Sequence, residues 1–237
     1  MNLRFGIVLG ALSVVACSQA AVLMDQIGSN PNDISSNEKA FTSQRFESSN
    51  SAFDVASLDD FSLSGGSRLT SVEAVVSLFN GGNLNFNAVQ SWNVEIYSSV
   101  AAAQGNLAGD IASITSSPTI TNSYFTSNTV NGLVNLPVDV TLAAGTYWIS
   151  VVARYNFSDG QAGINMSSFA GGFPNNTNAT GVNPGGGFGG GPFALQDNSG
   201  ANVNLAYRIN GEPVPEPASM IALTLGAAAL IRRRRNS

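Results

Sequence analysis

The stretch LTSVEAVVSLF, residues 69–79, alternates apolar and polar side chains over most of its length. Its apolar face holds Val72, Ala74, Val76 and Leu78, and its polar face holds Ser71, Glu73 and Ser77. Successive side chains of a strand point to opposite faces, so this period of two predicts a β-strand with one buried face. It is the clearest strand signal in the chain and it indicates a sheet packed on a core.

Other regions repeat this period. Trp92, Val94 and Ile96 alternate with polar residues after a Gly81-Gly82-Asn83 turn, which indicates that Trp92 belongs to the core. Residues 138–142 and 146–155 alternate on either side of a short Ala143-Ala144-Gly145 turn. This spacing predicts a hairpin in which Val140 and Ile149 both point inward, while Asp139 and Ser150 lie on the opposite, solvated face.

Weaker strand signals complete the pattern, and residues 98–107 favour a short helical turn. The weaker strand signals lie at residues 41–47, 53–63, 111–115, 123–130 and 203–209. No stretch of the body shows a convincing helical period. Short strands separated by turn-forming residues predict an all-β fold, an antiparallel β-sandwich of the jelly-roll-like kind, in one domain over residues 21–213.

One long segment, residues 169–193, lacks apolar periodicity and is rich in Gly, Asn and Pro. This composition predicts a flexible surface insertion. Its Gly-rich part has no Lys-Ser/Thr ending and precedes no helix, which argues against phosphate binding.

The composition is that of an extracellular β-domain rather than a cytosolic enzyme, with only 11% charged residues and 25 glycines. The formal net charge is −5, and half of the ten basic residues are Arg4 and the arginines at 232–235 near the chain ends. The body between the ends is therefore more acidic than the whole chain. Such a surface repels phosphate backbones, so we expect no nucleic-acid partner.

Residues 1–20 have the three parts of a secretory signal peptide. Arg4 is the charged region, residues 5–16 are apolar, and Ser18-Gln19-Ala20 is a small-x-small cleavage site before Ala21. A permanent N-terminal membrane anchor is one alternative, but the apolar run is short for a helix that spans the membrane. A second alternative is a lipoprotein, because Val14-Val15-Ala16-Cys17 resembles a lipobox whose cysteine carries lipid.

The other end, residues 214–237, also has three parts. The first part is an extended segment of Val214, Pro215, Glu216 and Pro217. It cannot join a following helix, because proline lacks an N–H and disfavours helix at the residue before it. The apolar run 218–231 suits a short transmembrane helix, below the roughly 20 residues of a permanent span. Arg232, Arg233, Arg234 and Arg235 then fix this end in the cytoplasm by the positive-inside rule.

This tail resembles the PEP-CTERM sorting signal in all three parts and in their order. The resemblance implies recognition by exosortase, a membrane sorting enzyme, in a Gram-negative-type bacterium that makes extracellular polysaccharide. It implies export through the translocon, transient anchoring in the inner membrane, and a final place at the cell surface or in the extracellular matrix or biofilm. Polysaccharide is then a possible partner. The tail predicts how the protein is sorted, and it does not predict an activity for the domain between the two ends.

Catalytic and metal-binding residues are scarce. The chain has no histidine and its one cysteine, Cys17, lies in the leader, so zinc and Ser-His chemistry lack their side chains. Asp59 and Asp60 are neighbours in a strand and point to opposite faces, which rules them out as a paired acid and base. With Asp54 and a loop carbonyl they are weak Ca²⁺ ligand candidates, and ordinary solvated turn acids are the alternative. We expect no catalytic residue and no required cofactor.

Trp148 is the best candidate for a sugar-stacking platform, because it lies opposite the apolar face of its strand. A central strand of a sandwich can be covered on both faces, so a core role is the alternative. The sequence therefore favours a non-enzymatic surface or matrix protein. A secreted carbohydrate-binding module and a hydrolase that uses carboxylates alone are the second and third hypotheses.

Overall fold

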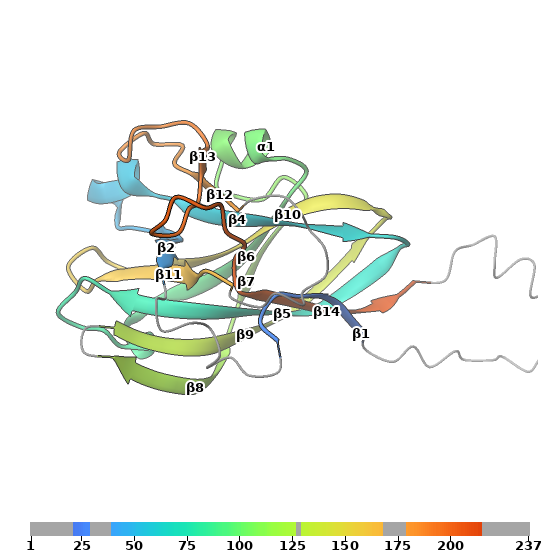
Figure 1. Ribbon diagram of the computed structural model, residues 1–237, viewed down its shortest axis with the longest axis horizontal. Coiled ribbons are helices and arrows are strands. Elements are labelled where there is room, and N and C mark those ends of the chain that lie inside the picture. The colour runs from blue at the N-terminus through green and yellow to red at the C-terminus, as the bar shows by residue number, and fades with distance from the viewer. Residues whose placement is uncertain (1–20, 29–38, 127–128, 168–178, 215–237) are drawn as a thin grey trace, which may run out of the picture.

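The computed structural model describes residues 21–28, 39–126, 129–167 and 179–214 (Figure 1). Two seven-stranded sheets pack face to face and enclose the main hydrophobic core. Nearly all the strand pairs are antiparallel, which confirms the all-β prediction. The predicted signal peptide at residues 1–20, the segment 168–178 and residues 215–237 lie outside the described residues.

The first sheet is built on the long strand predicted at residues 69–79. This strand, β5 (Ser67–Phe79), pairs along its whole length with β9 (Thr129–Leu142), and β9 pairs with β8 (Thr119–Thr126). On its other side, β5 pairs with two strands in succession, each of which pairs with an outer strand. These are β14 (Tyr207–Pro213) with β1 (Ala21–Asp25), and β11 (Gln161–Asn165) with β2 (Ala40–Thr42).

In the second sheet, β10 (Gly145–Arg154) lies between β6 (Ser91–Tyr97) and β4 (Ala56–Leu63). The remaining strands are β7 (Ala112–Ser116) beside β6, β12 (Thr180–Val182) and β13 (Phe193–Ala194) beyond β4, and β3 (Gln44–Arg45) parallel to the end of β10. The short helices are η2 (Ser48–Phe53), η3 (Phe86–Ala88) and α1 (Val100–Gly105). Successive strands from β4 to β6 and from β9 to β12 alternate between the sheets, and the jelly-roll assignment stays a prediction.

The main core confirms the apolar face of residues 69–79, while Ser77 on the predicted polar face is also buried, where its hydroxyl bonds to Asn131 and Asn165. The predicted inner face of β5 is buried at Val72, Ala74, Val76 and Leu78. From the facing sheet, β6 contributes Trp92, Val94 and Ile96 to the same core. Trp92 is therefore a core residue, as predicted.

The weaker strand signals are confirmed in place, with shifted boundaries. Residues 41–47 divide into β2 and β3, and residues 53–63 span the end of η2 and the whole of β4. Residues 111–115 correspond to β7, while the signal at 123–130 covers the end of β8 and the start of β9. β14 begins at Tyr207, four residues after the predicted start, and α1 is the helical turn expected within residues 98–107.

The predicted hairpin of residues 138–142 and 146–155 is wrong in its pairing. β9 belongs to the first sheet and β10 to the second, so the turn at Ala143 and Ala144 is a corner between sheets. Ile149 is buried in the main core. Val140 is half-buried and packs against the same core, so both side chains point inward. They reach the core from opposite sheets.

Ser150 corrects a second expectation. Asp139 is exposed, as predicted, but Ser150 is fully buried. Its hydroxyl lies 3.0 Å from Ser43 Oγ, which also donates to Val151 O. The outer face of β10 is not solvated, because Trp148 and Val152 on that face pack into a second apolar cluster with Ala103 of α1.

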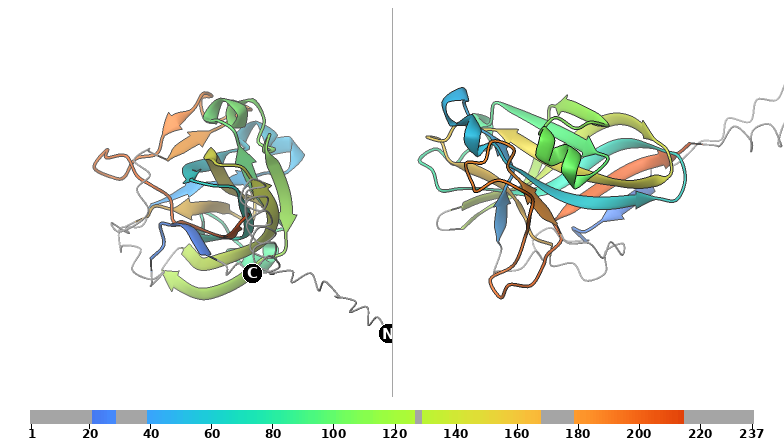
Figure 2. Two further views of the ribbon diagram at one scale, coloured as in Figure 1. Left: turned by 90° about the vertical axis from the view of Figure 1, so that its right-hand side faces the viewer. Right: turned by 90° about the horizontal axis from the view of Figure 1, so that it is seen from above.

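Both ends of the described domain lie at the same end of the sandwich. β1 runs antiparallel to β14 with Ala21 opposite Gly211, so the start of one strand lies beside the end of the other. Figures 1 and 2 show the chain entering and leaving on this side. β12, β13 and η2 lie at the opposite end (Figure 1).

Candidate functional site

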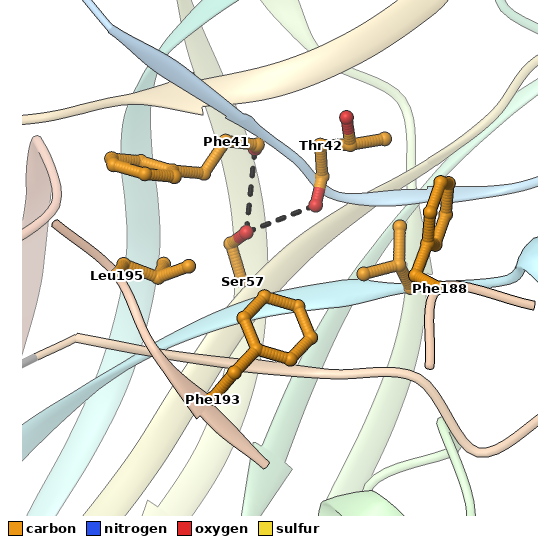
Figure 3. A pocket seen from close by; sticks show the side chains of 7 residues that line it. Phe41, Thr42, Ser57, Phe188, Phe193 and Leu195 are labelled. Carbon is orange, nitrogen blue, oxygen red and sulfur yellow. Dashed lines mark hydrogen bonds between the residues drawn. The ribbon is translucent and has the colours of Figure 1, made fainter. Parts of the chain in front are cut away.

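An open pocket of about 270 Å³ lies at the end of the sandwich remote from the chain ends. Most of its lining side chains are apolar, and they come from both sheets and the segment that follows residue 178 (Figure 3). The lining residues are Phe41, Thr42, Val55, Ser57, Phe188, Phe193 and Leu195. Three phenylalanine rings and few polar groups make it a site for an apolar face of a ligand.

Ser57 joins the two sheets at this pocket. Its hydroxyl contacts the carbonyl oxygens of Phe41 at 3.3 Å and Thr42 at 2.9 Å, which belong to β2 of the other sheet (Figure 3). The Ser57 hydroxyl has one proton to donate, and these two acceptors share it. The group therefore fixes the pocket wall rather than offering a donor to a ligand.

Glycine at position 181 makes room for one of the pocket rings. A Cβ added at Gly181 would lie 2.2 Å from the ring of Phe193. Gly181 pairs with Phe193 across β12 and β13, so the ring lies over the glycine backbone. Only a residue without a side chain lets Phe193 lie there, 38% exposed at the pocket edge.

Asn183 holds the next part of the chain in place. Its buried side chain donates to Ala52 O at 3.0 Å and Asp54 O at 2.7 Å, and it accepts from the Phe188 N–H at 2.7 Å. The ring of Phe188 meets Phe53 edge to face, with centroids 5.3 Å apart. Residues 179–193 were expected in a flexible insertion, and this part of it instead forms strands and a fixed loop.

Lys39 brings a cation next to Phe41 of the pocket. Lys39 Nζ is 5.4 Å from the centroid of the Phe41 ring and donates to Gln196 O at 2.7 Å. This distance is within the range of a cation–π contact. The rim thus combines an ammonium group with aromatic rings, a pairing that suits the hydroxyl groups and C–H faces of a sugar.

A second, more polar pocket of about 330 Å³ lies between η2, the end of α1 and Pro184-Gly185. Arg45 and Asp54 line it. Arg45 forms an ion pair at 2.9 Å with Glu95, which is fully buried, and Asp54 accepts from the Phe46 N–H at 2.7 Å. Burial raises the pKa of Asp54 and, more deeply in the fold, of Glu95.

The three Ca²⁺ candidates do not converge. Asp59 is buried and accepts from the N–H groups of Leu205 at 2.7 Å and Asp60 at 3.0 Å. Asp60 points to the other face of β4, and Asp54 bonds to Phe46. Within the described residues no three acidic, Cys or His side chains gather as a metal site.

Trp148 lies on the outer face of β10, opposite the main core, as predicted. It is half-buried and packs against a second apolar cluster under α1. That cluster comprises Ala56, Leu58, Tyr97, Ala103, Leu107, Val152 and Val182. This packing favours the core interpretation of Trp148 over the sugar platform.

The sequence did not single out the aromatic pocket. Phe41, Phe188 and Phe193 come from three separate segments, and no spacing along the chain predicts their meeting. One signal was present: Phe188 lies between glycines and Phe193 follows Pro192, where a bulky apolar residue has no periodic reason to be. Exposed rings in such a segment are a sign of a binding surface.

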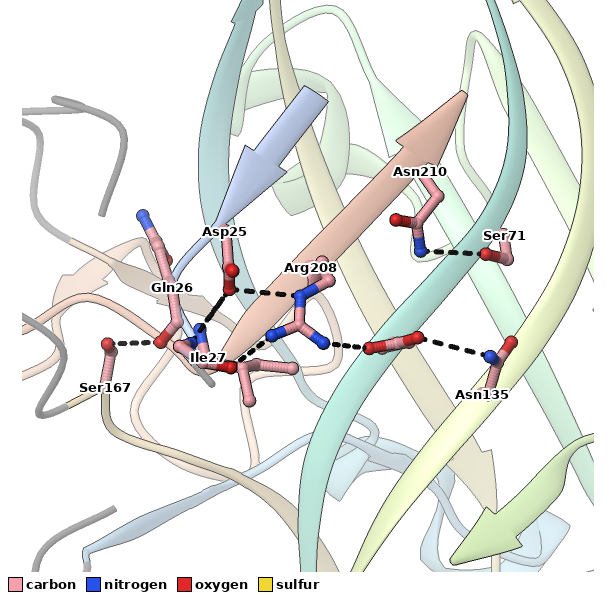
Figure 4. A network of polar contacts seen from close by, with 10 residues as sticks. Asp25, Gln26, Ile27, Ser71, Asn135, Ser167, Arg208 and Asn210 are labelled. Carbon is pink, nitrogen blue, oxygen red and sulfur yellow. Dashed lines mark hydrogen bonds and ion pairs between the residues drawn. The ribbon is translucent and has the colours of Figure 1, made fainter. Parts of the chain in front are cut away.

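The end of β14 carries the first residue of the predicted sorting motif. The Val214 N–H donates to Gly66 O at 2.8 Å, and Val214 is 39% exposed. Arg208 holds the strand from the side, with ion pairs to Asp25 at 3.2 Å and Glu73 at 2.7 Å (Figure 4). Pro215, Glu216, Pro217 and the arginines at 232–235 lie outside the described residues.

Comparison with known families shows that residues 213–235 match the PEP-CTERM protein-sorting motif. The expected sorting signal is confirmed. The motif implies export, membrane-anchored sorting and recognition by exosortase. In the part of the chain that the structure describes, no helix has the length and apolar character to cross a bilayer, and the predicted span 218–231 lies outside it. No curated protein and no solved structure matches the chain.

Proposed function

We propose that this chain is a non-enzymatic surface or matrix protein, sorted by exosortase and linked to the exopolysaccharide or biofilm layer. The observation that carries the proposal is the sorting motif at residues 213–235, which begins at the last residue of β14. The domain in front of it is a β-sandwich with jelly-roll-like connections, exported through the translocon behind a signal peptide.

The geometry of the chain ends supports this role. Arg4 and the arginines at 232–235 both belong on the cytoplasmic side of the membrane. Until the leader is cleaved, the domain is held at both ends in one membrane, so both ends must lie on one side of the fold. Ala21 opposite Gly211 supplies that arrangement, and it leaves the aromatic pocket facing away from the membrane.

The use of the buried carboxylates supports a non-enzymatic role. Asp59 accepts two backbone N–H groups inside the core, and Glu95 is tied to Arg45 and to the Gly109 N–H at 2.9 Å. Each of these groups joins separate segments of the chain through its hydrogen bonds. We propose that they are structural and that no catalytic step uses them.

The proposal is tested by removing the anchor. Without residues 218–237, the body is expected in the medium with the remaining tail unprocessed, because nothing holds it in the membrane for exosortase. Cell fractionation and immunoblotting of the full-length and truncated chains measure this, with a signal-peptide deletion as the control for export. Retention of the truncated chain in the envelope would contradict the proposal.

The aromatic pocket favours one second candidate, a carbohydrate-binding module. Sugar rings present apolar C–H faces that stack on aromatic side chains, and Phe188 and Phe193 are 47% and 38% exposed at this pocket. A glycan array with the purified body separates the candidates. Saturable binding to one class of glycan supports the module, and its absence leaves the matrix role alone.

A further inference from the structure

The sorting motif begins at the surface of the folded sandwich. Val214 is hydrogen-bonded to Gly66, and Pro215, Glu216 and Pro217 follow it directly. Three residues of extended chain span at most about 11 Å. An enzyme that holds Glu216 therefore stands within about 11 Å of the end of the domain.

The end of the sandwich next to Val214 is formed by two turns, which we call the end surface. They are Ser64-Gly65-Gly66 between β4 and β5, and Ala143-Ala144 between β9 and β10. Leu63 pairs with Gly145 and Ser67 pairs with Leu142, so the two turns lie side by side. Their residues are small and uncharged, which permits close approach of another backbone.

The last residues of β14 are held in the sheet. Pro213 lies opposite Ser67 and Glu212 opposite Arg68. Gly211 fits tightly, because a Cβ there would lie 2.6 Å from Arg68 O. Ile209 is buried in the main core, so peeling β14 back to gain a longer spacer would expose apolar surface.

We infer that the end surface docks against exosortase while the enzyme holds the motif. A protein fits this surface better than a bilayer does. The domain is acidic, and Arg68, a cation near the end surface, is engaged by Asp139 at 2.7 Å. A lipid surface attracts basic and aromatic side chains, and the two turns offer neither. Small residues at a contact are suited to close packing with protein.

Crosslinking from two matched positions tests the inference. Added side chains at Gly65 and at Gly82 meet no atom within 4 Å, so Gly65→Cys and Gly82→Cys should both fold. The strand β5 separates them by roughly 40 Å. Each is placed in the full chain with Cys17→Ala, which leaves one cysteine for a short maleimide photo-crosslinker. The cells must contain the exosortase.

The expected result is a crosslink to exosortase from Gly65→Cys and none above background from Gly82→Cys. Equal crosslinking from both positions, no crosslink from Gly65→Cys, or crosslinks from it to lipid alone would overturn the inference. This outcome is independent of the matrix role, because it depends only on recognition of the motif.

A disulfide clamp tests the alternative in which β14 peels away first. Arg68 and Glu212 are directly opposite in antiparallel strands, where Cα separations suit a disulfide, and both lie outside the matched motif. With both changed to Cys, docking of the folded end predicts that the oxidised and reduced forms leave the inner-membrane fraction equally well. Loss of sorting on oxidation, restored by reduction, would show that peeling is required and overturn the docking.

Discussion

Ala21 lies opposite Gly211 in the antiparallel pair of β1 and β14, so the first strand of the domain pairs with the last. β14 lies between β1 and β5, and among the described residues β1 pairs with no other strand. The N-terminal strand can therefore join the sheet only after the C-terminal end of the domain has been exported. Folding of the first sheet and presentation of the sorting motif are in this way linked.

The first prediction concerns β1. Met24 is 1% exposed in the main core, while Val22 on the same strand is 45% exposed. Met24→Ala should reduce the free energy of unfolding by about 2–5 kcal/mol, the range for a buried Met or Leu. Val22→Ala is the control and should change it by less than about 0.5 kcal/mol. Urea unfolding of the purified body measures both, and equal losses would contradict the placement of β1.

The second prediction concerns the corner between the sheets. Ile149 is fully buried and should lose about 2–5 kcal/mol on change to Ala. Val140→Ala should cost less, because Val140 is half-buried. Asp139→Ala removes an exposed ion pair with Arg68 and should stay within about 1 kcal/mol. Denaturant unfolding ranks the three variants, and a loss at Asp139 as large as that at Ile149 would contradict the register.

The alternation of residues 69–79 was enough to predict β5 and its buried face, because both depend on local geometry. The pairing of strands depends on which sheet each strand enters, and Val140 and Ile149 show that neighbouring strands need not pair. Ser150 shows a related failure. A polar residue in an alternating strand indicates solvent only if no segment covers that face, and the outer face of β10 is covered by a cluster that includes Ala103 of α1 and Val182 of β12.

The pocket was beyond sequence reasoning for the same reason. Phe41 and Phe188 are separated by most of the domain, and Ser57 holds β2 at the pocket through contacts between the sheets. The sorting motif was predictable in full, because its parts are contiguous and each has its own physical property. Local signals were reliable here, and contacts between distant segments were not.

The third prediction concerns pH. Burial raises the pKa of Asp59 well above its ordinary value, in spite of the N–H groups that donate to it. The folded protein then binds a proton there that the unfolded chain loses near pH 4. The stability from this proton is fully present below about pH 4 and is lost as the pH rises through the folded-state pKa.

Asp59→Asn removes this titration. The unfolding free energy of the wild type minus that of the variant should therefore be highest near pH 4 and fall toward neutral pH. Urea unfolding across that range measures it. Asp197→Asn is a control of opposite sign, because hydrogen bonds from Ser199 lower the pKa of Asp197 and its contribution to stability is lost as the pH falls. A difference for Asp59→Asn that is constant or grows with pH would contradict the prediction.

The fourth prediction concerns the leader. We expect cleavage after Ala20, so that the mature chain begins at the first residue of β1. Mass spectrometry of the exported protein should find an N-terminal Ala21. Cys17→Ala should leave localisation unchanged, because Cys17 is removed with the leader. Acyl chains on Cys17, or a changed localisation, would instead support the lipoprotein alternative.

The last prediction concerns the aromatic pocket. If it binds sugar, Phe188→Ala should remove most of the binding, because the ring supplies stacking area at the pocket edge. Gly181→Ala should do the same by a different route, since its methyl group displaces the ring of Phe193. Phe157 is 56% exposed and packs near Phe46, away from the pocket, so Phe157→Ala is the matched control.

Glycan binding and thermal unfolding of the same three variants separate ligand contact from stability. The pocket rings are partly exposed, so Phe188→Ala should cost well under the about 3–5 kcal/mol of a buried phenylalanine. Binding lost in Phe188→Ala and Gly181→Ala, kept in Phe157→Ala, and with little change in Tm would establish the pocket as the sugar site. If the glycan binds and all three variants retain it, the site lies elsewhere, and Trp148 becomes the next residue to change.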